Sequence, residues 1–490
     1  MKIKPALSEF KQMACEGDLI PVYEGFLADI ETPVSAYLKI KDKGFSYLLE
    51  SAEGGQRWGR YSFIGYKPHV VVLSKGRDVE ILKGEDKTLI KDVDNPIVTL
   101  REISRKFKPV TVEDLPPFQG GLVGFFNFDL IRKWEYLPVL SSDNNDTPEC
   151  IFTAASRLII FDHFKHRMTV VAFARLQEGH DPEEAYIKAC QEIAEMKGEL
   201  GRPLPAYSES PEFALSELSP NFRKEEFERA VNKAKEYIVA GDIIQVVLSQ
   251  RFSGEFSGED FLLYRNLRSV NPSPYMFYLN FGEIKLIGAS PEILVRLTDG
   301  KIELRPIAGT RPRGADKKED IALEQELLAD PKERAEHIML VDLGRNDVGK
   351  VAVAGSVSVP DLMVVERYSH VMHIVSSVEG TLNPGMDAFD LFMSAFPAGT
   401  VSGAPKIRAM EIIGELEPTS RGPYAGAVGY FAFNGNMDFC ITIRTISIIN
   451  NQLSIQVGAG IVADSSPEGE YQETLRKGGA MFRAIERVRE

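Results

Sequence analysis

The sequence has few cysteines and no long apolar run, and both absences narrow the class of protein. Its four cysteines, Cys15, Cys150, Cys190 and Cys440, are scattered and form no CxxC pair. We therefore expect no disulfide framework and a reducing, cytoplasmic location. No run of about 18 apolar residues occurs, and the N-terminus has no apolar signal core. We expect neither export nor a membrane-spanning helix.

An excess of basic residues and the common phosphate-binding motifs are also missing. Lysine and arginine total 57 residues and aspartate and glutamate 71, which gives a net charge of −14. Such a chain is a poor partner for nucleic acid or an anionic membrane, although local arginines can still bind a small anion. Neither GxxxxGK[ST] nor GxGxxG occurs, so nucleotide binding has little support. The lack of an HExxH motif argues against a zinc site.

Composition divides the chain at residues 201–221, where proline, serine and acidic residues are concentrated. This segment is predicted to be a linker or boundary between an N-terminal region, 1–200, and a region richer in motifs, 222–490. The second region has strand-like runs in blocks, short hairpin links and separate helices. This arrangement predicts an α+β fold rather than a doubly wound parallel sheet.

Periodicity places the elements of the second region. A helix is predicted over 221–240, ending at Gly241, and in a later helix Asp330 and Glu333 are expected to form a capping box. Three strands over 424–463 with short links predict an antiparallel meander. The segments 120–129 and 425–435 are similar, and both are expected to be strands. The later helices are predicted at 317–329, 331–343, 386–396, 405–416 and 467–488.

Two glutamates stand at informative helical positions. Glu336 shares an apolar stripe with Met339, Leu340 and Leu343, and a buried carboxylate requires a proton, a cation or a metal. The alternative is that Glu336 lies at the edge of a frayed stripe. In the last helix Glu473 and Lys477 share a face, and the alternative there is a solvated ion pair. Two glutamates with few histidines or cysteines nearby suit Mg²⁺.

The segment "PIAGTRPRG" (306–314) is predicted to be a loop that holds an anion at Gly309 and Thr310. We assign no direct contact to Arg311 and Arg313, which are expected to shape the loop or its field. Backbone N–H groups at 458–460 could bind an oxyanion, with tight strand packing as the alternative. A second Gly-Thr loop, 396–406, enters a helix whose N-terminus favours anions.

Six stretches of the second region carry a family resemblance. They are "PIAGTRPRG", "AEHIMLVDLGRNDVG", "ERYSHVMHIVS", "FPAGTVSGAPKIRAMEII", "GPYAGAVGYF" and "GAGIVADSSPEGEYQET". In this order and over nearly all of 222–490, the chain resembles the chorismate-utilising enzymes, and within them the large aminase subunits of anthranilate synthases. The resemblance implies antiparallel sheets packed as a sandwich with helices outside, and two regions that pack as one globule.

The resemblance also implies a reaction and its residues. Ammonia would add at ring C2 of chorismate as the C4 hydroxyl leaves, and pyruvate would then be eliminated to give anthranilate. Glu336 and Glu473 resemble the ligands of Mg²⁺, and Glu292 the acid that helps the hydroxyl leave. His373 resembles a histidine of the elimination step. The implied substrate contacts are Tyr424 and Arg444, which would clamp the enolpyruvyl carboxylate, with Gly309, Thr310, Thr400, Gly458, Ala459, Gly460 and Lys477.

Two positions separate members of the family by their nucleophile. Isochorismate and salicylate synthases carry a lysine where this chain has Gln245, and aminodeoxychorismate synthases carry a nucleophilic lysine where it has Ala308. Both differences favour ammonia as the nucleophile. None of the four cysteines lies in a nucleophile-elbow context, so the resemblance implies a separate glutamine amidotransferase subunit as ammonia source. Related enzymes form heterotetramers with that subunit.

A feedback site for L-tryptophan is implied by two further stretches, "LLES" (48–51) and "NPSPYMFYL" (271–279). Ser51, Pro274, Tyr275 and Met276 match the family's residues there. Without the family, the second stretch would be interpreted as a plain apolar strand. Because the site would take residues from both regions, tryptophan binding would be coupled to the arrangement of the chain.

Overall fold

Two long strands, β3 (Tyr61–Lys75) and β7 (Cys150–Asp162), pair along their length and hold the N-terminal part of the chain together. The structure is a computed structural model that describes residues 2–41, 44–52, 59–138, 147–176, 181–204, 212–368 and 371–489. The first half of β3 also pairs with β2 (Ser46–Glu50), and its second half with β4 (Asp78–Lys83). Two antiparallel sheets therefore diverge from this strand pair.

The first sheet runs from the N-terminal strands into the C-terminal part. Strand β2 pairs with β12, so residues far apart in the sequence become neighbours. Its strands, in spatial order, are β1 (Leu19–Leu27), β8 (Arg167–Arg175), β7, β3, β2, β12 (Tyr275–Phe281), β13 (Ile284–Ser290), β23 (Thr445–Ile449), β24 (Gln452–Ile461) and β11 (Gln245–Gly258).

The second sheet crosses between the two regions at β6 and β21, which pair with each other. Its order is β5 (Asp86–Ile90), β4, β3, β7, β6 (Gly121–Phe126), β21 (Ala427–Ala432), β22 (Met437–Ile441), β14 (Ile293–Thr298), β15 (Lys301–Leu304) and β19 (Val378–Thr381). All of these pairings are antiparallel, which confirms the predicted α+β class with antiparallel sheets.

The predicted meander over 424–463 is wrong in one respect. Its two hairpins, β21–β22 and β23–β24, form as expected. The run 437–449, however, breaks at 442–444, so that β22 pairs with β14 in the second sheet and β23 with β13 in the first. Arg444, directly before β23, has a left-handed backbone, with φ +52°, which is not a strand conformation. The break therefore carries the chain from one sheet to the other.

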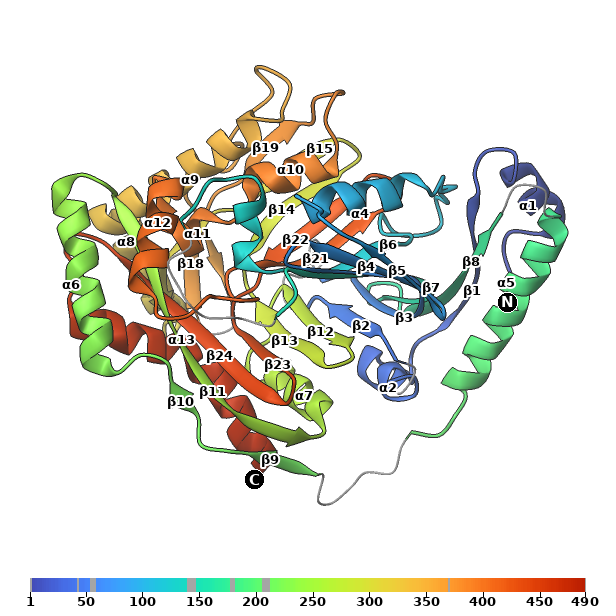
Figure 1. Cartoon of the computed structure of the whole chain (residues 1–490), viewed down its shortest axis with the longest axis horizontal. Helices are drawn as coiled ribbons and strands as arrows, with labels where there is room; N and C mark the ends of the chain where they lie inside the picture. Colours follow the sequence, from blue (N-terminus) through green and yellow to red (C-terminus); the bar gives the residue numbers. More distant parts are fainter. Residues whose placement is uncertain are drawn as a thin grey trace.

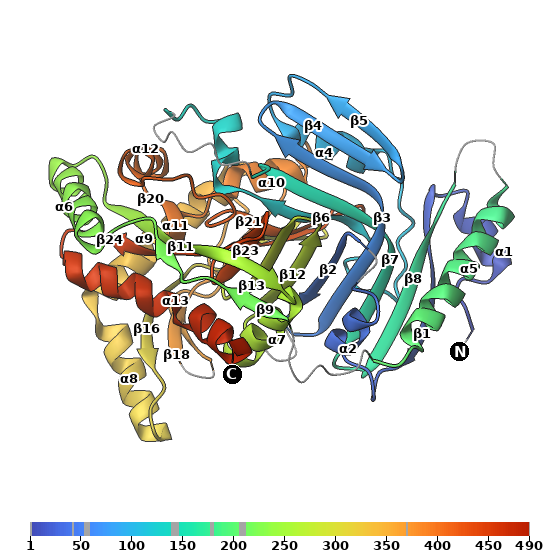
Figure 2. The same cartoon turned by 60° about the horizontal axis from the view of Figure 1, so that its bottom comes forward.

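Helices cover the sheets at both ends of the molecule (Figures 1 and 2). Helix α5 (Pro182–Leu200) lies on β8 and β1, and α13 (Pro467–Arg489) lies on β24 and beside α7 (Asp260–Val270) at the other end. Their apolar faces join a buried cluster that includes Ile193, Tyr264 and Met481. No helix in the described part of the chain is long and apolar enough to span a membrane.

The helices predicted from the sequence are present, with small shifts at their ends in all but one. Helix α6 (Lys224–Ala240) ends at Gly241, whose φ of +84° gives the left-handed cap that glycine permits. Helix α9 (Pro331–Gly349) continues six residues beyond the prediction. The others are α8 (Lys317–Ala329), α10 (Ala388–Ala395) and α12 (Lys406–Leu416). Local periodicity was therefore sufficient to find them.

Within the predicted boundary, 201–221, residues 205–211 lie outside the described part of the chain. The described remainder includes β9 (Phe213–Leu215) and β10 (Ser219–Pro220), which both pair with β11. The similar segments 120–129 and 425–435 contain β6 and β21, where Gly124 lies opposite Gly429. A Cβ at Gly124 would stand 1.9 Å from the Ile151 carbonyl oxygen, so the strands approach too closely for a side chain.

We expect Gly124→Ala to lower the free energy of unfolding by roughly 1–3 kcal/mol, because the methyl group must push β6 away from β7. Gly198→Ala is the matched control, since nothing lies within 4 Å of its Cβ position in α5 and alanine favours a helix. Thermal or denaturant unfolding measures both. An unchanged midpoint for Gly124→Ala would show that the strands can separate without cost.

Candidate active site

The segment predicted to be an anion-binding loop is instead a strand. Strand β16 (Ile307–Pro312) pairs with β18 (Val371–Val375), which also pairs with β17 (Val364–Arg367), in a small sheet of its own. Gly309 forms a bulge in β16, where φ is +71° and the register with β18 shifts. The bulge turns the Gly309 carbonyl toward His373, whose Nδ1 lies 2.9 Å from that oxygen and 3.1 Å from Thr310 Oγ1.

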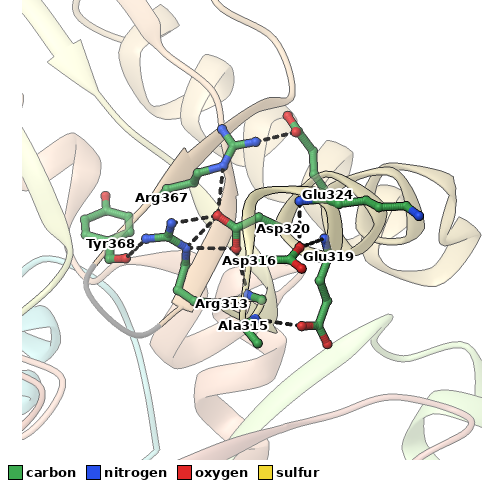
Figure 3. A network of polar contacts seen from close by, with 10 residues as sticks. Arg313, Ala315, Asp316, Glu319, Asp320, Glu324, Arg367 and Tyr368 are labelled. Carbon is green, nitrogen blue, oxygen red and sulfur yellow. Dashed lines mark hydrogen bonds and ion pairs between the residues drawn. The ribbon is translucent and has the colours of Figure 1, made fainter.

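Neither arginine of this segment is available for a substrate. Arg311 donates to Glu326 Oε1 at 2.8 Å, Asp330 Oδ2 at 3.0 Å and Glu333 Oε1 at 3.2 Å. Figure 3 shows Arg313, which donates to Asp320 at 2.6 Å and to the Tyr368 carbonyl at 2.8 Å. These contacts fix α8 and α9 to the small sheet.

The capping box predicted at the start of α9 is only half present. The Asp330 side chain accepts from the N–H groups of Lys332 and Glu333, as an N-cap does. The Glu333 side chain does not return to Asp330, because it accepts from Arg311 instead. The Glu333 carboxylate is therefore held toward β16.

Glu336 lies at the edge of the buried face of α9. The fully buried residues of that helix include His337, Val341 and Gly344, so the inward face is rotated by one position from the predicted stripe, and Glu336 is half-buried. Gln245 Nε2 donates to Glu336 Oε1 at 3.4 Å. Burial raises the pKa of Glu336, and the nearby charge of Glu333 adds to this shift. A cation beside the carboxylate would oppose both effects.

Helix α13 brings Glu473 and Lys477 to the same place. Lys477 Nζ lies 3.6 Å from Glu473 Oε1 and donates to the Gly458 carbonyl at 3.2 Å. Burial lowers the pKa of Lys477, and the positive charge of Arg444 lowers it further. Lys477 also acts on Glu336, whose pKa it lowers. The pair is therefore half-buried and faces the site, rather than being a solvated pair on the helix surface.

Glu292 and Arg444 lie at the two points where strands change sheet. Glu292 stands between β13 and β14, and Arg444 precedes β23. The Ile441 N–H donates to the Glu292 carbonyl at 3.0 Å, and the Ala289 N–H to the Arg444 carbonyl at 3.1 Å. These two bonds hold the crossings side by side. Burial raises the pKa of Glu292 to about 7, although the Thr400 hydroxyl, Arg444 and Lys477 act to lower it.

Tyr424 and the glycines of β24 complete this wall. A Cβ at Gly458 would stand 2.6 Å from the Tyr424 hydroxyl, and a Cβ at Gly460 2.4 Å from Gln245 Nε2. Both glycines therefore face the site, whereas Ala459 between them points to the opposite face of the strand and is buried. Burial raises the pKa of Tyr424 to about 12, so its hydroxyl stays protonated as a donor.

Thr400 lies in α11 (Gly399–Ser402) and lines a small cavity of about 40 Å³ together with Glu292. Its hydroxyl is buried close to Glu292, whose pKa it lowers, and makes no hydrogen bond of ordinary geometry among the described residues. Gln245 Oε1, which is buried near Glu336, likewise has no hydrogen-bond partner among the described residues. Ala308 lies in β16 opposite Ile374, one position before the bulge. A polar ligand would satisfy the Thr400 and Gln245 oxygens.

The predicted catalytic, substrate and metal residues thus converge on one site. Arg444 links them. Burial lowers the pKa of Arg444, and Tyr424, Glu473 and Glu292 act to raise it. The pKa of His373 is lowered by burial and also by the charge of Arg444. Carboxylates at 292, 336 and 473 are interspersed with Arg444 and Lys477. No group of three or more histidine, cysteine or acidic side chains is arranged to hold a metal among the described residues.

A second cavity, of about 490 Å³, lies where the two sheets meet. The four residues predicted to bind tryptophan, Ser51, Pro274, Tyr275 and Met276, all line it. This is a volume typical of small-molecule sites. Strands β2 and β12 bring the two stretches together, with Glu50 opposite Met276. Aromatic walls are supplied by Tyr61, Phe63, Phe118, Phe277 and Tyr430.

Sequence reasoning missed the polar floor of this cavity. Arg296 Nε donates to Asp438 Oδ2 at 2.9 Å, and the Tyr275 hydroxyl donates to Asp438 Oδ1 at 2.9 Å. The signal was present in "EILVRLT", where one arginine interrupts an apolar strand. Sequence reasoning also missed Arg421 and Glu417, a buried ion pair behind Tyr424, of which Arg421 directly precedes the motif "GPYAGAVGYF".

Comparison with known proteins identifies the family of the chain. The chorismate binding enzyme family matches residues 44–483. Anthranilate synthase component 1 of Acetivibrio thermocellus is 47% identical over 495 residues, which cover 99% of each chain. Its counterpart in Aquifex aeolicus is 48% identical over 491 residues, which cover 99% of this chain and 98% of that one.

Solved structures share the fold. The crystal structure of anthranilate synthase component I from Streptococcus pneumoniae has a TM-score of 0.77 at 37% identity, covering 93% of this chain and 98% of that one. The menaquinone-specific isochorismate synthase of Escherichia coli has a TM-score of 0.73 at 19% identity, which shows the fold alone. The chain therefore belongs to the chorismate binding enzyme family, among the anthranilate synthase component 1 proteins.

Proposed function

We propose that the chain converts chorismate and ammonia into anthranilate and pyruvate in tryptophan biosynthesis, with Mg²⁺ as cofactor. The observation that carries this proposal is the convergence of Glu292, Arg444 and Lys477 with the carboxylates of Glu336 and Glu473. A dicarboxylate substrate needs cationic contacts, and a leaving hydroxyl needs a proton donor. This site offers both within one half-buried space.

Glu292 is suited to protonate the leaving C4 hydroxyl. With its pKa raised to about 7, a large part of the carboxyl population carries a proton near neutral pH. As ammonia forms its bond at C2, both ring double bonds shift, from C1=C2 to C1=C6 and from C5=C6 to C4=C5, and the C4–O bond breaks. The proton of Glu292 leaves with that oxygen as water, and the carboxylate that remains is stabilised by Arg444 and Lys477.

His373 is suited to the elimination of pyruvate. Its Nδ1 lies 2.9 Å from the Gly309 carbonyl, which requires a proton on Nδ1 and leaves Nε2 with a free electron pair. Burial lowers the pKa of His373, so the ring is neutral and can accept a proton. Removal of the ring proton at C2 and cleavage of the C3–O ether bond then release enolpyruvate and complete the aromatic ring. A proton added to the methylene carbon of enolpyruvate gives pyruvate.

The chain's residues fit Mg²⁺. Glu336 and Glu473 present oxygen ligands, and the raised pKa of Glu336 marks a carboxylate in need of a positive neighbour. When bound, Mg²⁺ would supply a positive charge for the ring carboxylate of the substrate. Gln245 would hold Glu336 in place through its Nε2. Arg444 and Tyr424 would bind the enolpyruvyl carboxylate, for which a planar guanidinium is well suited.

Ammonia is favoured as the nucleophile because the chain lacks the two lysines with which other family members supply or activate a different nucleophile. Gln245 and Ala308 stand at those positions, and an amide cannot act as a base at neutral pH. The name component 1, carried by the full-length relatives, supports a second component as partner. We propose that this partner is a glutamine amidotransferase that releases ammonia to the site.

The large cavity is proposed to bind L-tryptophan as feedback inhibitor. Its aromatic walls suit an indole, and the Arg296–Asp438 pair offers charge near the floor. Asp438 and Cys440 lie on β22 and Arg296 on β14, the strands that lead to Arg444 and from Glu292. A ligand that shifts these strands would therefore also shift Glu292 and Arg444.

The fluorescence of anthranilate gives a direct test. The purified chain with chorismate, Mg²⁺ and ammonium should produce it, whereas glutamine should replace ammonium only when the partner subunit is added. Accumulation of isochorismate without ammonium would indicate another chorismate enzyme, an isochorismate synthase. Tight tryptophan binding without any turnover, even with partner and ammonium, would instead indicate an amino-acid sensor.

For Glu336→Gln we expect a loss of Mg²⁺-dependent rate of at least about tenfold with the fold retained, since a ligand charge is removed. Mg²⁺ titrations of rate, together with circular dichroism, measure this. Glu326→Gln is the control, because Glu326 is an exposed partner of Arg311. Near-normal activity of Glu336→Gln at low Mg²⁺ would remove Glu336 from the ligand set.

The acid role of Glu292 predicts a pH dependence. Because the protonated form is required, kcat/KM should fall as pH rises through about 7, when the concentration of unprotonated ammonia is kept constant. Glu292→Gln should lose this step and most of the rate. A profile that stays flat from pH 6 to about 8 would assign the leaving-group proton to another donor.

Ser51→Phe should weaken inhibition by tryptophan at least about tenfold while leaving the uninhibited rate within about twofold, because a phenyl ring would occupy part of the cavity. Ser51→Ala, which adds no volume, is the control. Inhibition curves at fixed chorismate measure the difference. Equal inhibition of the wild-type chain and Ser51→Phe would place the tryptophan site elsewhere.

A further inference from the structure

A buried ion pair, Arg421 with Glu417, stands behind the proposed active site. Both side chains are almost fully buried, at 2% and 6% exposure. Arg421 Nε lies 2.9 Å from Glu417 Oε2, and Nη2 lies 2.6 Å from Glu417 Oε1, so the pair is bidentate. None of the steps derived above uses either residue.

The remaining donors of Arg421 reach two segments that carry site residues. Nη1 donates to the Val401 carbonyl at 2.7 Å, directly after Thr400. Nη2 donates to the Val247 carbonyl at 2.6 Å, and Val247 lies opposite Gly460 in the pairing of β11 with β24. One guanidinium therefore ties α11 to the strand pair that presents the glycine wall.

The same guanidinium also contacts two aromatic rings. Its central carbon lies 5.6 Å from the centre of the Tyr424 ring and 4.6 Å from that of Phe128. These are distances at which a cation is attracted to a ring face. Phe128 belongs to the 3-10 helix η1 (Phe128–Lys133) of the N-terminal region. The backbone N–H of Phe128 donates to the Gly422 carbonyl. The turn that carries Tyr424 is thus held from both sides.

Glu417 extends the network to a second position on β11. Its Oε1 accepts from the N–H of Ser249 at 2.8 Å and from the Ser249 hydroxyl at 2.9 Å. Gln456 Nε2 in turn donates to that hydroxyl at 2.8 Å. Ser249 lies opposite Gly458, so the pair fixes the backbone behind both glycines that face the site.

We infer that Arg421 is a positioning residue of this active site, a role that rests on the proposed function. It sets the relative places of Thr400, Tyr424 and the Gly458–Gly460 strand without touching the substrate. Its planar fork meets a carboxylate and two carbonyls at once, which the single ammonium of a lysine cannot reproduce. A displacement of about 1 Å in such a wall can lower the rate of catalysis by roughly a hundredfold.

A double variant separates positioning from stability. Arg421→Met alone leaves Glu417 as an unpaired buried charge and should lower Tm strongly. Adding Glu417→Gln removes that charge, keeps the bond to Ser249 and should restore most of Tm. If Arg421 positions the site, kcat should remain lowered at least about tenfold in the double variant, whereas a merely structural role would let kcat recover with Tm.

Arg421→Lys is the second variant, and Arg157→Met the control. The lysine keeps the charge beside Glu417 but loses the fork, so we expect near-normal Tm with lowered kcat. Arg157 is a similarly buried arginine, paired with Glu199 in the N-terminal region, and its loss should lower Tm without changing kcat of the folded enzyme. The shift of Tm caused by chorismate gives a readout independent of turnover, and it should shrink only in the Arg421 variants.

The inference and the proposed function fail in different ways. If the wild-type chain makes no anthranilate, the proposed function fails, and the chorismate-induced Tm shift still reports on Arg421. If the wild-type chain is active, and the double variant and Arg421→Lys both show wild-type kcat, KM and Tm shift, Arg421 has no positioning role.

Discussion

The active site depends on two places where the backbone passes from one sheet to the other. At the first, between β13 and β14, the chain carries Glu292, and at the second, between β22 and β23, it carries Arg444. Two hydrogen bonds hold the crossings together, from Ile441 to Glu292 and from Ala289 to Arg444. Because these residues do not lie within a regular strand, their side chains can point into the space between elements. The left-handed backbone of Arg444 is a strained conformation for a residue with a side chain, and the surrounding structure holds it in place.

The buried position of Glu292 at the first of these crossings also explains its pKa. Burial raises the pKa of Glu292 to about 7, so a large part of this carboxyl population carries a proton near neutral pH. The Thr400 hydroxyl, Arg444 and Lys477 limit this shift without cancelling it. Farther along β22 and β14, Asp438 and Arg296 line the large cavity. The fold thus places two cavities on one pair of strands.

Sequence patterns were most successful where structure is local. The helices α6, α8 and α12 were located within a few residues, because their apolar spacing and end signals lie within each segment. The hairpins β21–β22 and β23–β24 were also found from their short links. The pattern failed at 437–449, since a run of alternating residues does not reveal that its two halves pair in different sheets. It failed again at 306–312, where glycine and proline suggested a loop but pairing with β18 made a bulged strand.

By itself, the sequence determined the class of fold, the family and the identities of the residues that meet at the site. Those features depend on periodicity and on motifs that are contiguous in the chain. Only the tertiary structure decided that Arg311 and Arg313 form ion pairs with carboxylates of α8 and α9, and that His373 is oriented by Gly309. It alone revealed Arg421, because a buried arginine is defined by the groups around it. These contacts join residues far apart in the sequence, and their geometry arises only when the two sheets have formed.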